Sequence, residues 1–295
     1  MREGSRDERQ QSEPSYAMAD ELERACEVIA AARLLVVATG AGMSRESGIP
    51  TFRDAQEGLW ARYDPQQLAT RQGFRDDPAR VWGWYNYRRR LIRRCEPHAG
   101  HLALARLETV VPEMAVITQN IDGLHQRAGS ATVIELHGNI GRFKCFDRDH
   151  PVTTPVPLSD AEGAVRPPLC ERCRSPIRPD VVWFGEALPT GAFERAERYA
   201  SGCDVMLVVG TSGLVYPAAG LPATARVSGA TVIEVSAAES TVRVVLPVML
   251  PLVAEIVVVP AASVVARPVA LMVAAAVFED TQVTDPVMSW VELSV

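Results

Sequence analysis

Long apolar segments and an excess of positive charge are both missing from this 295-residue sequence. Residues 1–19 are polar and lack the apolar stretch of an export signal, so we expect a disordered tail on a cytoplasmic protein. Residues 242–278 are rich in Val, Ala and Pro, but Glu255 and Arg267 divide them into runs shorter than the ~18 to 20 apolar residues of a membrane span. The net charge of -6 argues against a general nucleic-acid binder.

Cysteine is scarce, with six residues in the whole sequence. Because no export signal precedes them, we do not expect disulfides, and metal ligation or free thiols explain the cysteines better. Three of them lie within the proline-rich residues 142–179. The six are Cys26, Cys95, Cys145, Cys170, Cys173 and Cys203.

Short apolar runs rich in β-branched residues recur along the chain and are typical of strands buried on both faces of a parallel sheet. Helical spacing of apolar residues marks residues 20–33, and helix-like stretches such as residues 101–109 and 192–200 lie between the runs. This alternation predicts an α/β fold with a Rossmann-like, doubly wound parallel sheet. The predicted strands are residues 34–38, 114–118, 133–136, 205–209 and 231–235.

Two segments interrupt the alternation, and we expect them to form a smaller inserted module. Residues 52–97 are aromatic and charged and supply a helical part, and residues 142–179 supply a zinc-ribbon-like part that contains the three cysteines. The remaining predicted regions are a tail at 1–19, a large domain at 20–51, 98–141 and 180–240, and a divergent apolar C-terminal region at 241–295.

Small and hydrogen-bonding residues follow several of the predicted strands, at residues 40–42, 119–122, 137–139 and 210–212. Since ligands bind at the carboxyl ends of parallel strands, this convergence predicts a binding site. The glycine loop at 40–42 alone fits a phosphate cradle and an ordinary tight turn equally well. The third glycine of a dinucleotide fingerprint is replaced by Arg45, which argues against a dehydrogenase.

Five segments together resemble the signature motifs of sirtuins. The glycine loop reads Gly-Ala-Gly-Met-Ser-Arg-Glu-Ser-Gly-Ile-Pro-Thr-Phe-Arg, and a second segment reads Thr-Gln-Asn-Ile-Asp-Gly-Leu-His. Three shorter ones, Glu-Leu-His-Gly, Val-Trp-Phe-Gly-Glu and Gly-Thr-Ser, follow in the family's order and spacing. The segments are residues 40–53, 118–125, 135–138, 182–186 and 210–212, and the resemblance covers residues 22–235.

The resemblance implies an enzyme that binds NAD, consumes it and removes acyl groups from protein lysines. His137 would be the general base that activates a ribose hydroxyl, a role that suits a side chain titrating near neutrality. Asn120 would act beside it and would form the nicotinamide pocket with Asp122, while Phe52 would shield the reacting ribose carbon. Ser236 stands where the family has Asn, near the adenine-side ribose. The implied NAD-site residues are Gly40, Ala41, Gly42, Ser44, Glu46, Phe52, Arg53, Gln119, Asn120, Ile121, Asp122, Gly210, Thr211, Ser212 and Ser236.

The resemblance also implies that an acyl-lysine protein or peptide binds as an added strand, which supplies affinity through the backbone. We expect the enzyme to be a monomer and expect neither a nucleic-acid nor a membrane partner. The segment implied to pair with the peptide consists of Val182, Trp183, Phe184, Gly185 and Glu186.

Tyr85 and Arg88 resemble the Tyr-x-x-Arg helix of the class III sirtuins, which prefer acidic acyl groups. Residues three apart share a helix face, so a hydroxyl and a guanidinium could together bind the carboxylate of succinyl- or malonyl-lysine. The alternative is a solvated basic helix that binds nucleic acid or an acidic partner. Its further basic residues are Arg89, Arg90, Arg93 and Arg94.

The structural metal site of sirtuins is matched in part. The family usually has two Cys-x-x-Cys pairs around a zinc ion, and here Arg148 stands where the second cysteine of the first pair would be. A metal-free module held by packing is an equal alternative. The predicted ligands are Cys145, Cys170 and Cys173, with His150 or Asp149 available as a fourth.

Two other functions stay open beside NAD-dependent deacylation. Mono-ADP-ribosyl transfer would use the same cleavage of NAD with a different acceptor. A non-catalytic NAD-binding interaction module is favoured by the altered region after residue 235 and opposed by the intact His137, Asn120 and Asp122.

Overall fold

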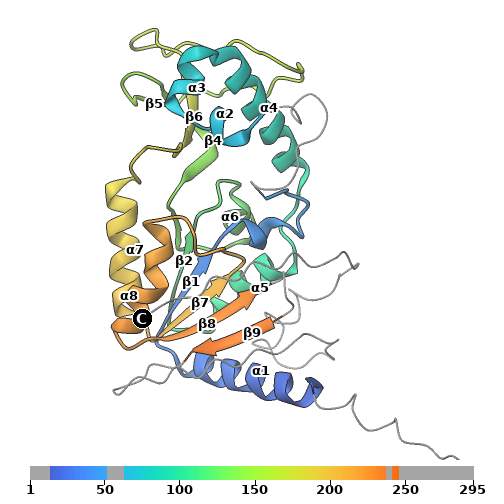
Figure 1. Ribbon diagram of the computed structural model, residues 1–295, viewed down its shortest axis with the longest axis vertical. Helices are drawn as coiled ribbons and strands as arrows, with labels where there is room; N and C mark the ends of the chain where they lie inside the picture. Colours follow the sequence, from blue (N-terminus) through green and yellow to red (C-terminus); the bar gives the residue numbers. More distant parts are fainter. Residues whose placement is uncertain (1–13, 52–62, 237–240, 246–295) are drawn as a thin grey trace, which may run out of the picture.

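The computed structural model describes residues 14–51, 63–236 and 241–245 (Figure 1). A large sheet with helices on both faces carries a smaller module at one end. Five parallel strands and one antiparallel edge strand form this sheet, in the order β3-β2-β1-β7-β8-β9. The strands are β1 (Leu34–Thr39), β2 (Glu113–Thr118), β3 (Val133–Glu135), β7 (Val205–Val209), β8 (Thr231–Ser236) and β9 (Thr241–Val245).

The strand order confirms the predicted doubly wound α/β fold. The chain builds outward from β1 through β2 to β3, then crosses back to place β7 on the other side of β1. The reversal of direction between β1 and β7 is a topological switch point, which is where open parallel sheets bind ligands. All five predicted strands are present, and each end lies within one residue of its predicted position.

Burial on both faces explains why the strands are continuous apolar runs rather than alternating ones. Leu35 and Val37 point into a core formed with the helices α1 (Pro14–Ala31) and α5 (Ala99–Leu107). Val36 and Ala38 point into a second core on the opposite face. The helices α7 (Thr190–Gly202) and α8 (Leu221–Val227) cover this second face (Figure 1).

The smaller module joins three helices to a three-stranded antiparallel sheet of order β5-β4-β6. Thr70 and Asp77 cap two of the helices by accepting hydrogen bonds from the amides of Gly73 and Arg80, and Pro78 occupies the first turn after Asp77. Large aromatic side chains, including Trp84 and Trp183, fill the core beneath them. The elements are α2 (Pro65–Leu68), α3 (Arg71–Asp76), α4 (Pro78–Arg94), β4 (Gly138–Cys145), β5 (Pro151–Val152) and β6 (Ile177–Val181).

Two elements extend beyond the predicted large domain. Helix α1 begins at Pro14, inside the predicted tail, because the good helix formers after this proline continue the helix N-terminally. Strand β9 lies in the predicted C-terminal region and pairs with β8, where its alternating valines suit an edge strand. No helix in the described ranges has the length and apolar character that a membrane crossing requires. Residues 1–13 and 246–295 of the two predicted terminal regions lie outside the described residues.

Candidate active site

The glycine loop after β1 packs directly against the loop after β7, at the switch point of the sheet. The Gly42 amide donates to the carbonyl oxygen of Gly210 at 2.8 Å. A Cβ atom at Gly42 would lie 2.8 Å from the Gly210 Cα, and one at Gly210 would lie 2.4 Å from the Met43 nitrogen. Only glycine permits this approach, so these residues are present because the two loops touch.

The loop after β2 joins this pair through side-chain amides. Gln119 donates from Nε2 to Thr211 Oγ1 at 3.0 Å. Asn120 donates from Nδ2 to the Gly40 carbonyl oxygen at 2.9 Å and to Ser44 Oγ at 3.0 Å. The structure therefore brings together predicted NAD-site residues from three separate strand ends. Ala41 and Ser44 bound the 3-10 helix η1 (Ala41–Ser44), which continues the glycine loop.

Asp122 is a largely buried carboxylate held by two donors. Ser44 Oγ donates to its Oδ2 at 2.7 Å, and the Leu124 amide donates to its Oδ1 at 2.9 Å. Burial raises the pKa of Asp122 above its usual range, while these two hydrogen bonds act in the opposite direction. The neighbouring Ile121 packs against the core of the small module, which anchors this loop to both domains.

His98 supports the glycine loop from below and was not among the predicted site residues. Its Nδ1 accepts from the Gly100 amide at 2.9 Å, so its Nε2 carries the proton and donates to the Met43 carbonyl oxygen at 2.6 Å. The predicted site residue Glu46 approaches the same ring, with Oε2 3.5 Å from Nδ1. The sequence signal was a histidine directly before α5, where it caps the helix.

His137 sits between β3 and β4 with a defined tautomer. Its Nδ1 lies 3.0 Å from the Gln119 carbonyl oxygen, which can only accept, so Nδ1 carries the proton and Nε2 offers a lone pair. Burial lowers the pKa of His137 below its usual range, and the hydrogen bond to Gln119 partly offsets the effect. At neutral pH this favours the unprotonated Nε2 that a general base requires.

The segment predicted to bind peptide runs beside this histidine. The Val182 amide donates to the His137 carbonyl oxygen at 2.9 Å, as a continuation of the pairing between β4 and β6. Trp183 is only 2% exposed and points into the module, whereas Phe184 is 50% exposed. Gly185 follows with φ +82, a left-handed conformation that glycine adopts without strain. The segment thus links the base to the protein surface.

Tyr85 and Arg88 share one face of α4, where Tyr85 contacts this segment and the Arg88 guanidinium lies 5.2 Å over the Trp84 ring. The Tyr85 hydroxyl accepts a hydrogen bond from Trp183 Nε1 at 2.8 Å. Burial raises the pKa of Tyr85 to about 12, so the hydroxyl is protonated and can donate at neutral pH. Burial lowers the pKa of Arg88, against the attraction of Tyr85, Tyr87 and Asp122.

Two of the four neighbouring arginines, Arg89 and Arg90, are engaged within the protein, whereas Arg93 and Arg94 are exposed as the alternative interpretation of α4 expects. Arg89 stacks 4.6 Å over the Phe143 ring and donates to the Val156 carbonyl oxygen at 3.3 Å. Arg90 donates to the Ser159 carbonyl oxygen at 2.5 Å. These two side chains tie the helix to the loop of the small module.

A model of the Sir2 family matches residues 40–217, which include the glycine loop, His137 and the segment beside it. The chain belongs to the Sir2 family. It is 50% identical over 212 residues to an NAD-dependent protein deacylase of Methylococcus capsulatus, covering 71% of this chain and 83% of that protein. It is 53% identical over 208 residues to an NAD-dependent protein deacylase of Ralstonia nicotianae, covering 70% and 82%.

Solved Sir2 structures share the fold. A Sir2 homologue in complex with NAD superposes with a TM-score of 0.65 at 43% identity, covering 72% of this chain and 81% of that one. A Sir2 protein bound to acetylated peptide gives a TM-score of 0.62 at 34% identity, covering 73% and 86%.

Three cysteines and one histidine of this Sir2 chain form a complete set of four ligand residues, which corrects the prediction of an incomplete site. The donor atoms of three cysteines and one histidine all lie within 4.8 Å of one another. The Cys173 and Cys145 Sγ atoms are 3.7 Å apart, and the Cys170 Sγ is 3.8 Å from the His150 Nδ1. Tetrahedral zinc, with bonds of ~2.3 Å to sulfur and ~2.0 Å to nitrogen, spaces such atoms by about 3.5 to 3.8 Å. The four residues are Cys145, His150, Cys170 and Cys173.

A tight turn explains why the fourth ligand lies five residues after Cys145 rather than three. The Cys145 amide donates to the His150 carbonyl oxygen at 2.9 Å, which closes the turn. Asp149 has φ +51 within it, a left-handed conformation that aspartate tolerates. The Asp149 carboxylate points away to Lys144 Nζ at 3.4 Å, so the alternative fourth ligand is wrong.

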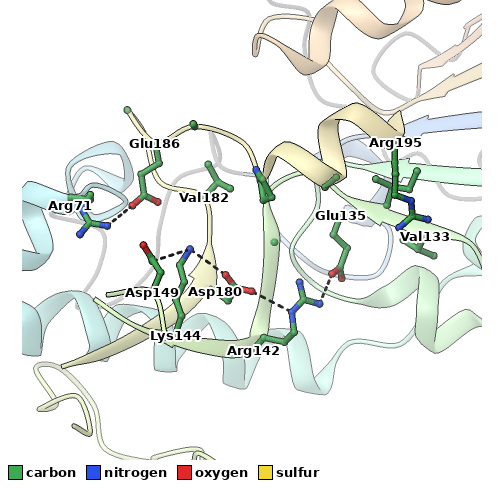
Figure 2. Close-up of a pocket in the computed structure, with 16 residues that line it drawn as sticks. Arg71, Val133, Glu135, Arg142, Lys144, Asp149, Asp180, Val182, Glu186 and Arg195 are labelled. Carbon is green, nitrogen blue, oxygen red and sulfur yellow. Dashed lines mark hydrogen bonds and ion pairs between the residues drawn. The ribbon is translucent and has the colours of Figure 1, made fainter. Parts of the chain in front are cut away.

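A groove of about 780 Å³ lies along the other side of the peptide segment, between α7, β3 and the small module (Figure 2). Charged residues line it, and several pair with one another. Lys144 contacts Asp180 at 3.3 Å, Arg142 hydrogen-bonds Glu135, and Arg71 contacts Glu186 at 3.1 Å (Figure 2).

Some predicted site residues cannot be placed. Phe52 and Arg53 lie outside the described residues. Ser236 ends β8 opposite Thr241, and its side chain lies outside the described part. Ser212 follows Thr211 at the exposed end of the β7 loop, near the Gln119 contact.

Proposed function

We propose that the protein removes acyl groups from protein lysines and consumes NAD, yielding nicotinamide and O-acyl-ADP-ribose. The observation that carries the proposal is the position of His137. Its Nδ1 is held by the Gln119 carbonyl oxygen, and its own carbonyl accepts from Val182, so the base adjoins both the NAD loops and the peptide segment. The relatives named as NAD-dependent protein deacylases support the same activity.

NAD supplies an activated ribose carbon with nicotinamide as the leaving group, and the residues at the switch point fit it. The glycine loop packs on the β7 loop with no side chain between them, at the strand ends where sheets of this kind bind a dinucleotide. Asn120, Ser44 and Asp122 form one hydrogen-bonded set that can hold a carboxamide. His137 Nε2 takes the proton from a ribose hydroxyl, so that this oxygen can attack the acyl carbon.

The peptide is proposed to pair with the backbone around Gly185. Four amides of the segment already donate to acceptors within the chain. The Val182 amide donates to the His137 carbonyl oxygen, and the Phe184 amide donates to the Ala69 carbonyl oxygen. The Trp183 amide donates to the Glu186 carboxylate, and the Glu186 amide donates to the Trp183 carbonyl oxygen. Gly185 is left with space around its Cα and can offer its backbone to an incoming strand.

We further propose a preference for succinyl- and malonyl-lysine over acetyl-lysine. Tyr85 supplies a protonated hydroxyl, and Arg88 supplies a half-buried guanidinium that lies over the Trp84 ring. A carboxylate on the acyl group could form a charged hydrogen bond with this guanidinium, whereas an acetyl group could not.

One experiment tests the activity. The protein is incubated with NAD and matched acetyl-, malonyl- and succinyl-lysine peptides, and nicotinamide release is measured together with the mass of the ribosyl product. We expect release with the acidic acyl peptides and a product that contains the acyl group. A mass increase on the protein or peptide itself would show ADP-ribosyl transfer instead, and no release with any peptide would refute catalysis.

We propose that the cysteine and histidine cluster binds one structural zinc ion. The spacing of the donor atoms fits a tetrahedral site, and three thiolates with one imidazole are ligands that zinc favours. The amides of Arg148 and His150 each lie 3.3 Å from the Cys145 sulfur and donate to it, which stabilises its thiolate. Metal analysis of the purified protein should find one zinc per chain.

A further inference from the structure

Trp183 lies between Tyr85 of helix α4 and the ion pair of Arg178 with Glu186. On one side its indole Nε1 donates to the Tyr85 hydroxyl at 2.8 Å. On the other side the Arg178 guanidinium stacks 3.7 Å from its ring centroid. Phe74 packs against the same ring at 5.4 Å. The indole therefore has little freedom to change its orientation.

The backbone of Trp183 is held by the same ion pair. Arg178 is 0% exposed and donates to both Glu186 oxygens, at 2.8 and 2.7 Å. Glu186 Oε2 also accepts from the Trp183 amide at 2.9 Å, and Arg71 reaches Oε1 from the groove (Figure 2). Although burial alone raises the pKa of Glu186, these donors and the charge of Arg178 bring it below its usual range.

We propose that Trp183 is a positioning residue that turns the Tyr85 hydroxyl toward the acyl group. A tyrosine hydroxyl has one proton to donate. Because the Tyr85 oxygen accepts a hydrogen bond from the indole, its own proton is directed away from Trp183 and is available to the carboxylate of the acyl group. Arg178 and Glu186 keep the indole in the required place. This inference rests on the proposed acyl preference.

The arrangement makes acyl selectivity depend on an indole that does not touch the acyl group. Tyr85 is 3% exposed, so solvent cannot receive its hydroxyl proton in other orientations. The indole fixes the orientation of the hydroxyl before the substrate arrives, and pre-organised donors bind more tightly than mobile ones. An acetyl group has no carboxylate to receive the proton, so Trp183 should affect its turnover only through the peptide segment to which this residue belongs.

The test is a double-mutant cycle on the intact protein, with Trp183→Phe, Tyr85→Phe and both together. Phenylalanine keeps an aromatic ring under Arg178 but removes the indole donor. Because a neutral hydrogen bond is lost, we expect kcat/KM for a succinyl-lysine peptide to fall about three- to tenfold in Trp183→Phe. Any effect on peptide binding through the segment 182–186 is common to both peptides, so the ratio of the succinyl to the acetyl kcat/KM should fall by most of that factor, and the KM for NAD should change little. The double variant should match Tyr85→Phe alone, since Trp183 acts only through that hydroxyl.

A matched control and a spectroscopic readout separate positioning from packing. Trp82→Phe makes the same change at a buried ring of α4, the helix that carries Tyr85, but this ring packs on Phe143 instead. It should leave the acyl selectivity unchanged. In the nuclear magnetic resonance spectrum, the indole proton signal that disappears in Trp183→Phe should shift in Tyr85→Phe.

Three results would overturn the inference. These are equal losses of kcat/KM on both peptides in Trp183→Phe, additive losses of kcat/KM in the double variant, and an indole proton signal that does not shift in Tyr85→Phe. A wild-type enzyme without any preference for the succinyl peptide would instead refute the proposed acyl selectivity itself, whatever the indole signal does.

Discussion

Replacing Arg88 by Met should convert the enzyme from one selective for acidic acyl groups into one without that selectivity. Methionine fills a similar volume on the same face of α4 but carries no charge. In the wild-type protein the guanidinium is half-buried, lies 5.2 Å over the Trp84 ring and is attracted by the Asp122 carboxylate. A substrate carboxylate is therefore expected to pair with it directly rather than through water.

The magnitude follows from the kind of bond that is lost. Hydrogen bonds between charged partners contribute about 1.5 to 3 kcal/mol. At about 1.4 kcal/mol per tenfold change, kcat/KM for a succinyl-lysine peptide should fall about 10- to 150-fold in Arg88→Met. The acetyl-lysine value should stay within about twofold, because an acetyl group offers no carboxylate to the guanidinium.

The assay is nicotinamide release at subsaturating peptide and saturating NAD, with each peptide measured separately. Arg93→Met is the matched control, since Arg93 is exposed on the same helix, and it should leave both values unchanged. A parallel loss on succinyl and acetyl peptides in Arg88→Met would refute the reasoning. It would mean that Arg88 supports the helix or the NAD site rather than the acyl group.

Three further changes test other parts of the site. His137→Ala should abolish deacylation while the thermal unfolding temperature changes little. In the wild type, protonation of His137 removes the base, so kcat/KM should fall with decreasing pH, with a midpoint below the ordinary histidine pKa because burial lowers this pKa. His150→Ala should lose zinc and lower the unfolding temperature, as measured by metal analysis and calorimetry, whereas Asp149→Asn should keep the metal. Gly42→Ala should weaken NAD binding at least tenfold by calorimetry, because its Cβ would lie 2.8 Å from the Gly210 Cα.

The parallel strands of the large sheet were predictable because most residues on both of their faces are buried and apolar. Leu35 and Val36 point to opposite cores, so both faces demand apolar side chains and the run is continuous. Strand β9 was missed for the related reason that it lies in a long Val-rich stretch, where the pattern does not show which valines pair with β8. Edge pairing depends on the partner strand, which is remote in sequence.

The fourth metal ligand was undecidable from sequence because it depends on backbone conformation. Asp149 and His150 are adjacent and both can bind metal. The turn places Asp149 at φ +51, which sends its carboxylate to Lys144 and brings the next side chain back toward Cys145. The resemblance to the sirtuin zinc site predicted three ligands, and the turn with the left-handed Asp149 selects the fourth.

The residues that sequence reasoning missed are those that hold the predicted ones. Arg178 is a buried arginine in β6, and no motif distinguished it from a surface charge. His98 likewise acts through the Met43 carbonyl rather than on a ligand. Every buried polar group needs a hydrogen-bond partner, so the sequence predicts that such supporting residues exist but does not show which residues they are.

Asp122 is positioned by hydrogen bonds within the protein and can still accept a further hydrogen bond from a ligand. Each carboxylate oxygen accepts one bond from a described residue, from Ser44 or from the Leu124 amide. A carboxylate oxygen can accept two. The protein bonds therefore fix the orientation of the group, and the second lone pair of one oxygen remains for a carboxamide N–H. An Asp122 with every lone pair occupied would bind nothing, and one without its two donors would have a still higher pKa, because burial raises this pKa and the hydrogen bonds lower it.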